Sequence, residues 1–316
     1  MKINTLYKYI NLVLRCAIGV LAVYFIYERV KDDFLNDLLR IKLMSNHVFT
    51  FVVVILMMLV NWGIEALKWR YTIRSTEGIT VFKAFRLTIL GVTLGFLTPN
   101  RVGEIPARAF LLNRINFKVI TLKTSVSSFS QVLITLLLGV VGAVFTLHHF
   151  SNIHHSLIWI ITLSFGLLFL LLIYFKTNKL VLLMNRVRFL KEKEIFAAFS
   201  EFTLCELVNI LIMSFLRYLV FATQYYLILN AFGISLNGIG EISLIAVCFM
   251  VASFIPTIVI SEIGVRGSVA LFVFGSISIL ESQIILASLV LWLINVALPA
   301  LIGLFSLKEL KLIKEN

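Results

Sequence analysis

The stretch TPNRVGEIPAR, residues 98–108, interrupts a long apolar segment with two prolines, a glycine, two arginines and a glutamate. The residues before it, 87–97, are almost all apolar, and residues 109–112 after it are apolar again. Proline and glycine stop helices, and charge in hydrocarbon is costly. Irregular backbone at membrane depth is tolerated only inside protein or beside a water-filled cavity. The stretch therefore predicts a broken membrane helix with charge at its break.

The composition of the whole chain supports a membrane environment. Of its 316 residues, 60% are hydrophobic and only 14% are charged, against about 25% charged in an ordinary soluble domain. Apolar runs long enough to span the hydrocarbon core recur along the chain, whereas a transmembrane barrel would show short alternating stretches. We predict an all-α polytopic membrane protein with a single transmembrane domain, residues 1–316. The candidate spans are residues 10–27, 47–67, 121–147, 156–175, 208–229, 242–255, 267–280 and 284–305.

The basic residues predict the orientation. With the N-terminus inside, 22 of the 28 lysines and arginines lie on the inner side, ten of them in residues 68–123. The positive-inside rule then places both termini in the cytoplasm. We expect the protein in the cell inner (plasma) membrane. The first segment lacks a small-residue cleavage site and is expected to stay as a helix. Residues 185–206 have one apolar face and predict a helix at the cytoplasmic surface.

The net charge of +12 raises the possibility of nucleic-acid binding. The basic residues flank apolar runs and form no stripe with exposed aromatic residues, so no nucleic-acid partner is expected. The partners that we expect are membrane lipids, and no metal or other cofactor is predicted. The oligomeric state stays open.

Two interrupted segments predict re-entrant hairpins. In residues 81–115, basic residues at both ends place both ends on one side of the membrane, and the expected breaks are at Pro99, Gly103 and Pro106. Residues 242–280 contain a second interruption, FIPTIVISEIGVRGSVALF at 254–272, with expected breaks at Pro256 and Gly264. The spans that precede the two hairpins run in opposite directions. This order predicts inverted repeats, about 47–147 and 208–306, a plan that places a transport site near the midplane.

The charged residues of the two breaks form the candidate binding site. We expect them to share a cavity that binds a lipid phosphate, because arginine forks match phosphate oxygens. The candidate substrate-binding residues are Arg101, Glu104, Arg108, Arg217, Glu262 and Arg266. Pseudo-symmetry favours Arg108 as the partner of Glu262. The alternative is that the arginines and glutamates only neutralise each other and lock the hairpins together.

The motifs LTPNRVGEIPARAFLL and IPTIVISEIGVRGSV resemble the two signature regions of the flippase-like membrane domain of lysylphosphatidylglycerol synthases and their stand-alone relatives. The resemblance covers roughly residues 5–310 and implies inverted re-entrant hairpins and movement of lipids between leaflets. It also has departures: residues 127–131 read SSFSQ where many relatives carry a Glu–Arg pair, and Gly267 stands where many have a glutamate.

The function expected from this resemblance is that of a lipid flippase or transporter for a phosphate-bearing lipid, either a phospholipid or a polyprenyl-phosphate-linked intermediate. The chain ends at Asn316, which leaves no room for the soluble aminoacyl-transferring domain, so enzyme activity is not expected. Two alternatives stay open: a membrane enzyme, and an accessory scaffold of lipid or glycan synthesis.

Overall fold

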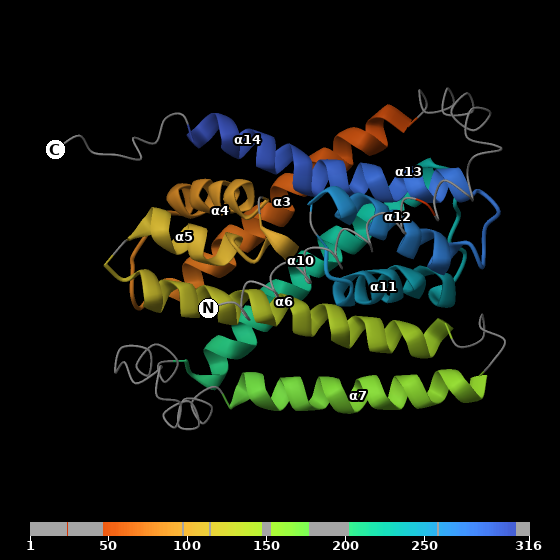
Figure 1. The fold of residues 1–316 in the computed structure, drawn as a ribbon, viewed down its shortest axis with the longest axis horizontal. Coiled ribbons are helices and arrows are strands. Elements are labelled where there is room, and N and C mark those ends of the chain that lie inside the picture. The colour runs from red at the N-terminus through yellow and green to blue at the C-terminus, as the bar shows by residue number, and fades with distance from the viewer. Residues whose placement is uncertain are drawn as a thin grey trace, which may run out of the picture.

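The computed structural model describes residue 24 and residues 47–96, 98–113, 115–146, 153–176, 202–257 and 259–307. These ranges are helical and contain no strand (Figure 1). Four of their helical stretches are long and apolar enough to cross a membrane: Val48–Ile73, Phe117–Thr146, Leu204–Ala231 and Glu281–Ser306. The prediction of an all-α polytopic membrane protein is confirmed. The predicted span 10–27, apart from residue 24, and most of the predicted surface helix 185–206 lie outside the described residues.

The helices form two series with the same order: a long helix, two short helices joined by a break, and another long helical stretch. The first series is α3 (Val48–Ile73), α4 (Val81–Gly95), the 3₁₀ turn η2 (Pro99–Arg101), α5 (Glu104–Leu112) and α6 (Phe117–Thr146). The second is α10 (Leu204–Ala231), α11 (Ile239–Phe254), α12 (Val259–Phe274) and then α13 (Glu281–Trp292), η4 (Leu293–Ala297) and α14 (Leu298–Leu307). Between them, α7 (Ile153–Phe175) packs against α6.

The first helices of the two series, α3 and α10, pack against each other in opposite directions. Three contacts run from one end of the pair to the other: Gln224 donates to the carbonyl oxygen of Val54 (2.9 Å), Lys68 donates to Ser214 (3.3 Å), and Arg74 pairs with Glu206 (2.7 Å). Residue numbers rise along α3 as they fall along α10. The two helices are therefore antiparallel, as inverted repeats require.

Small residues join each hairpin to the long helix of the other series. α6 packs against α11, and α14 packs against α4 (Figure 1). A Cβ atom at Gly142 of α6 would lie 2.8 Å from the carbonyl oxygen of Ser243 of α11. One at Gly303 of α14 would lie 2.9 Å from the carbonyl oxygen of Ile89 of α4. Since membrane helices associate by close backbone approach at small residues, both crossings depend on glycine.

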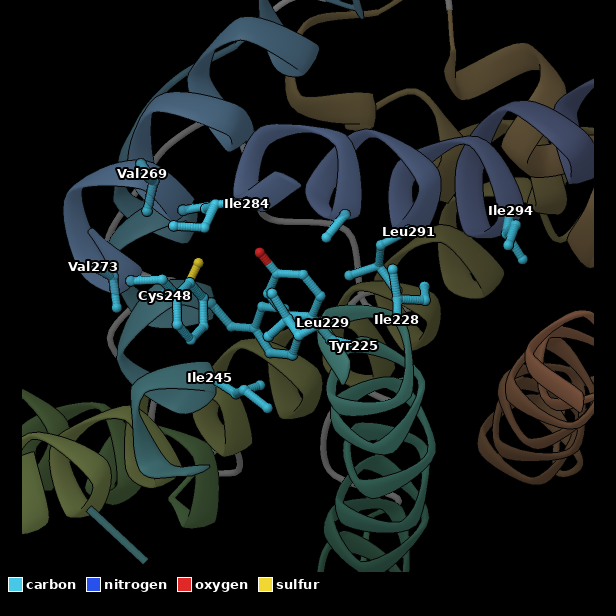
Figure 2. Packing of buried hydrophobic residues seen from close by; sticks show 14 of the residues in the cluster. Tyr225, Ile228, Leu229, Ile245, Cys248, Val269, Val273, Ile284, Leu291 and Ile294 are labelled. Atoms are coloured by element: carbon cyan, nitrogen blue, oxygen red, sulfur yellow. The ribbon is translucent and has the colours of Figure 1, made fainter. Parts of the chain in front are cut away.

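A buried apolar core anchors the second hairpin. Tyr225 and Ile228 of α10, Cys248 of α11, Val273 of α12 and Ile284 of α13 all contribute to it (Figure 2). Three helices, α10, α11 and α13, thus pack with α12 in one core. This packing fixes the position of α12 and of the charged residues in its first turns.

The breaks are narrower than predicted. In the first, between α4 and α5, Asn100 and Arg101 adopt left-handed backbone angles with φ of 48° and 55°. The second lies around Pro256, between α11 and α12. Two predicted break positions are wrong, because Pro106 lies in the first turn of α5 and Gly264 lies inside α12. Proline is accepted there because the first N–H groups of a helix have no intrahelical acceptor.

The helices of the hairpins are too short to cross a bilayer alone. The longest, α11 and α12, have 16 residues each, or about 24 Å at 1.5 Å per residue, against about 30 Å of hydrocarbon. This length fits helices that enter the membrane and return. The face from which each hairpin enters stays a prediction.

Candidate cationic cavity

A buried carboxylate on α3, Glu65, holds three cations. It pairs with Lys68 (2.9 Å), with Arg108 of α5 (2.8 Å) and with Arg217 of α10 (3.1 Å). Arg108 also pairs with Glu104, four residues before it on the same helix. We name these five residues the Glu65 cluster. It contains three cations and two carboxylates, which leaves a surplus of one positive charge.

A second carboxylate, Glu262 of α12, joins the two breaks. It pairs with Arg266, one turn later on the same helix (2.8 Å), and with Arg101 of the first break (3.4 Å). We name these three residues the Glu262 cluster. Two cations and one carboxylate again leave one surplus positive charge.

The backbone of the breaks also meets directly. The Asn100 amide donates to the carbonyl oxygen of Thr257 (2.9 Å), and the Thr257 amide donates to the Asn100 side-chain oxygen (2.5 Å). Left-handed angles at non-glycine residues are strained and persist only where surrounding contacts hold them. The reciprocal bonds to Thr257 hold Asn100, and the pairing with Glu262 directs Arg101 across the junction.

One cavity of about 290 Å³ lies between the two clusters. Arg101, Arg217 and Arg266 all line it, with side chains 22%, 20% and 25% exposed. Arg108 is only 3% exposed and is absent from the lining. The cavity therefore presents three guanidinium groups, and the surplus charge of both clusters surrounds it.

Amide side chains orient Arg217 in this cavity. Asn61 of α3 accepts from the Arg217 Nε (3.0 Å) and donates to Asn295 (3.0 Å), and the guanidinium lies 5.1 Å from the centre of the Trp62 ring. Asn295 belongs to the π-helical turn η4, shortly before Pro299. Pro299 has no N–H to donate to the carbonyl of Asn295, and π turns of this kind are frequent at functional sites.

A family model for the lysylphosphatidylglycerol synthase transmembrane region matches residues 12–303. The chain belongs to this family. The match covers both hairpins and the four helical stretches that are long enough to cross a membrane, apart from the last few residues of the fourth. No curated protein matches the chain. Family and fold together establish a multi-pass membrane protein of the lipid-related kind.

In this member of the family, the structure separates the predicted site residues into two groups. It brings Arg101, Glu262 and Arg266 together, and Arg217 reaches the same cavity. The predicted pairing of Arg108 with Glu262 is wrong, because Glu65 of α3 and the adjacent Glu104 engage Arg108 instead. Gly91 of α4 makes room for it: a Cβ atom there would lie 3.1 Å from the Arg108 Nε.

Sequence reasoning missed Glu65, the centre of the larger cluster. A signal was present, since Asn61, Glu65 and Lys68 are spaced by four and three residues and so share one face of an apolar helix. Lys68 and Lys123, counted among the cytoplasmic segment 68–123, lie on α3 and α6 and are 0% and 1% exposed. These two lysines are therefore buried inside the protein, and the orientation of the chain stays a prediction.

Residues 127–131 also contribute to the cavity. The neutral Gln131 lines its wall and donates to the carbonyl oxygen of Ser214 (3.3 Å). The adjacent Ser130 hydroxyl lies 2.7 Å from that of Ser214. The wall of the cavity is therefore polar and uncharged at Gln131.

Proposed function

We propose that this protein moves a phosphate-bearing lipid between the leaflets of the membrane and leaves the lipid chemically unchanged. The observation that carries the proposal is the cavity lined by three partly exposed guanidinium groups. Guanidinium forks bind phosphate oxygens bidentately, and such charge-assisted bonds are about twice as strong as neutral ones. Membership in a family of lipid-related membrane domains supports the same class of substrate.

The charge of the two clusters narrows the choice of lipid head group. The two clusters together leave two positive charges in excess. A phosphate monoester carries about −1.5 to −2 at pH 7, whereas a zwitterionic phospholipid carries no net charge. The cavity therefore favours a polyprenyl phosphate or a related monoester over a zwitterionic lipid, and it disfavours a cationic aminoacylated head group.

The ion pairs suggest how an incoming phosphate replaces Glu262 as the partner of two arginines. The bond between Arg101 and Glu262 is long at 3.4 Å, and both Arg101 and Arg266 are partly exposed. An incoming phosphate competes with Glu262 for these two groups, while Glu65 and Asn61 keep Arg217 in place. When the cavity is empty, the ion pairs with Glu65 and Glu262 keep the guanidinium groups oriented without a ligand.

The test is reconstitution of the purified protein in liposomes that carry a fluorescent polyprenyl phosphate in one leaflet. A membrane-impermeant quencher reports how much of the lipid has crossed, and chromatography of the extracted lipid reports whether it is unchanged. We expect protein-dependent crossing of unchanged lipid and little crossing of a matched zwitterionic lipid. Chemical conversion of the lipid would favour the enzyme alternative, and neither crossing nor conversion would favour the scaffold; both results would overturn the proposal.

A further inference from the structure

An apolar groove opens beside the cationic cavity. It has a volume of about 410 Å³ and lies between α6, α10 and α11. Leu138 and Phe145 of α6, Ala222 of α10 and Ile245 of α11 are among its lining residues. Phe145 is 52% exposed, so the groove is open at the outer surface of the helices. Its wall is apolar where that of the cavity is cationic.

The cavity and the groove share one wall residue, Tyr218 of α10. Its ring packs edge-on against Phe249, which also lines the cavity, with 5.9 Å between ring centres. Tyr218 is 6% exposed, and its hydroxyl has no hydrogen-bond partner among the described residues. An apolar ring with an unused donor thus stands at the boundary between the two spaces.

The two spaces follow each other along the same helices. On α6, Gln131 and Thr135 line the cavity, and Leu138 and Phe145 line the groove. With Gly142, which also lines the groove, these positions recur every three or four residues and therefore lie on one helix face. From Gln131 to Phe145 the helix rises about 21 Å. On α11 the order is reversed, with Phe249 in the cavity and lower-numbered residues in the groove, because α11 runs antiparallel to α6.

We propose that the cavity and the groove are two halves of one binding site for a single-chain anionic amphiphile, with Tyr218 at the junction. The phosphate lies among the three arginines, and the hydrocarbon or prenyl chain lies in the groove. The proposal deepens the proposed function and rests on it for the head group. The occupant of the groove follows from its continuity with a cavity whose positive charge fits only an anionic head.

The direction of the groove gives the orientation of the bound lipid. The N-terminal end of α6 is basic, with Lys118 and Lys123, and the groove lies on the far side of the cavity from that end. A bound lipid therefore has its head group toward the basic end and its chain away from it. This is the orientation of a lipid in the leaflet at the basic face, which the sequence predicts to be cytoplasmic. The site thus holds a lipid as it arrives from that leaflet.

Photolabelling of the reconstituted protein tests the site without depending on transport. Two probes carry the same long alkyl chain with a diazirine near its end: one is an alkyl phosphate and the other is the matching alcohol. Mass spectrometry locates the labelled residues. We expect the phosphate probe to label the groove segments of α6, α10 and α11, in preference to α7, by about tenfold more than the alcohol does. That factor is what one charge-assisted hydrogen bond contributes.

Variants fill the groove without touching the arginines. Ala222→Phe and the exposed Thr223→Trp place a large side chain in the groove from α10. The matched control is Gly166→Trp on α7, where an added Cβ atom would meet nothing within 4 Å. We expect both groove variants to abolish the preference of the phosphate probe and the control to keep it. Arg101→Lys should lower labelling of the groove by the phosphate probe only.

The outcomes separate this proposal from the proposed function. Labelling of the groove by the phosphate probe, lost in the groove variants, supports the two-part site even if liposomes show no lipid crossing. Equal labelling by both probes, or labelling that the groove variants leave unchanged, would overturn the two-part site even if crossing is observed.

Discussion

Both hairpins continue after their break with a glutamate and an arginine four residues apart, yet the two pairs differ in exposure. Glu104 and Arg108 open α5, and Glu262 and Arg266 lie in the first turns of α12. The Arg108 side chain is 3% exposed, whereas that of Arg266 is 25% exposed and lines the cavity. The same local motif is therefore buried in one half and open to a ligand in the other.

The long helix that faces each hairpin explains the difference. In the first half, α3 offers Glu65 to Arg108, and this extra carboxylate draws the arginine away from the cavity. In the second half, α10 has no acidic residue after Glu206 and carries Arg217 instead. An arginine that is satisfied by two carboxylates stabilises the fold. An arginine that shares a single carboxylate with another arginine can still bind a ligand.

The largest expected effect is the loss of Glu65. Glu65→Gln leaves Lys68, Arg108 and Arg217 without their shared counter-charge in a buried site, and breaking a buried pair costs about 3–5 kcal/mol. We expect a large drop in the melting temperature of the purified protein. The control is Glu206→Gln, which breaks the more exposed pair with Arg74, for which about 0–1 kcal/mol is expected. Equal drops in melting temperature for the two variants would show that Glu65 does not hold the three cations together.

A smaller effect is expected in the second half. Glu262→Gln affects Arg101 and Arg266, which are partly exposed and can be solvated, so the expected cost is about 1–3 kcal/mol. Combining Glu262→Arg with Arg101→Glu should recover part of the lost stability, because the swap restores the pair. The same exchange between Glu262 and Arg108 should recover none. Recovery by the second swap alone would show that the pairing described above is wrong.

The sequence predicts the broken helices, the antiparallel first helices and all three arginines that line the cavity, because prolines, glycines and charges are conspicuous in apolar segments. It does not predict which carboxylate each arginine meets. Glu65 and Arg108 are distant in sequence and become neighbours only because α3 packs against α4 and α5 packs against α6. Pseudo-symmetry misleads here, because it treats Arg108 and Arg266 as equivalent while the helices facing them differ in charge.

Gly91 gives a smaller test of the buried pair. Gly91→Ala adds a Cβ atom that would approach the Arg108 side chain, and overpacking of this kind costs about 1–2 kcal/mol, the lower part of its usual range. We expect a modest drop in melting temperature and little change in lipid crossing. Gly63→Ala on α3, where a Cβ atom would meet nothing within 4 Å, is the matched control and should not be destabilised.

The contact between the breaks allows a test that needs no change in stability. Asn100→Cys combined with Thr257→Cys places two thiols where the Asn100 backbone amide already donates to the Thr257 carbonyl oxygen. A disulfide requires Cα atoms within about 7 Å, so we expect ready crosslinking under mild oxidation. Asn100→Cys combined with Ser276→Cys, in the turn after the C-terminal end of α12, should not crosslink. If the Asn100/Thr257 cysteine pair does not crosslink, the two breaks are not in contact.

The most direct test of the central claim compares Arg108→Lys with Arg266→Lys in one preparation, by melting temperature and by crossing of labelled polyprenyl phosphate. Lysine keeps the charge and loses the fork. We predict that Arg108→Lys lowers the melting temperature and that the protein which stays folded still moves lipid. Arg266→Lys should keep the melting temperature and slow crossing by about tenfold or more, the factor for a charge-assisted hydrogen bond. The same response in both variants, or a slowed crossing only in Arg108→Lys, would contradict the assignment of one arginine to the fold and the other to the ligand.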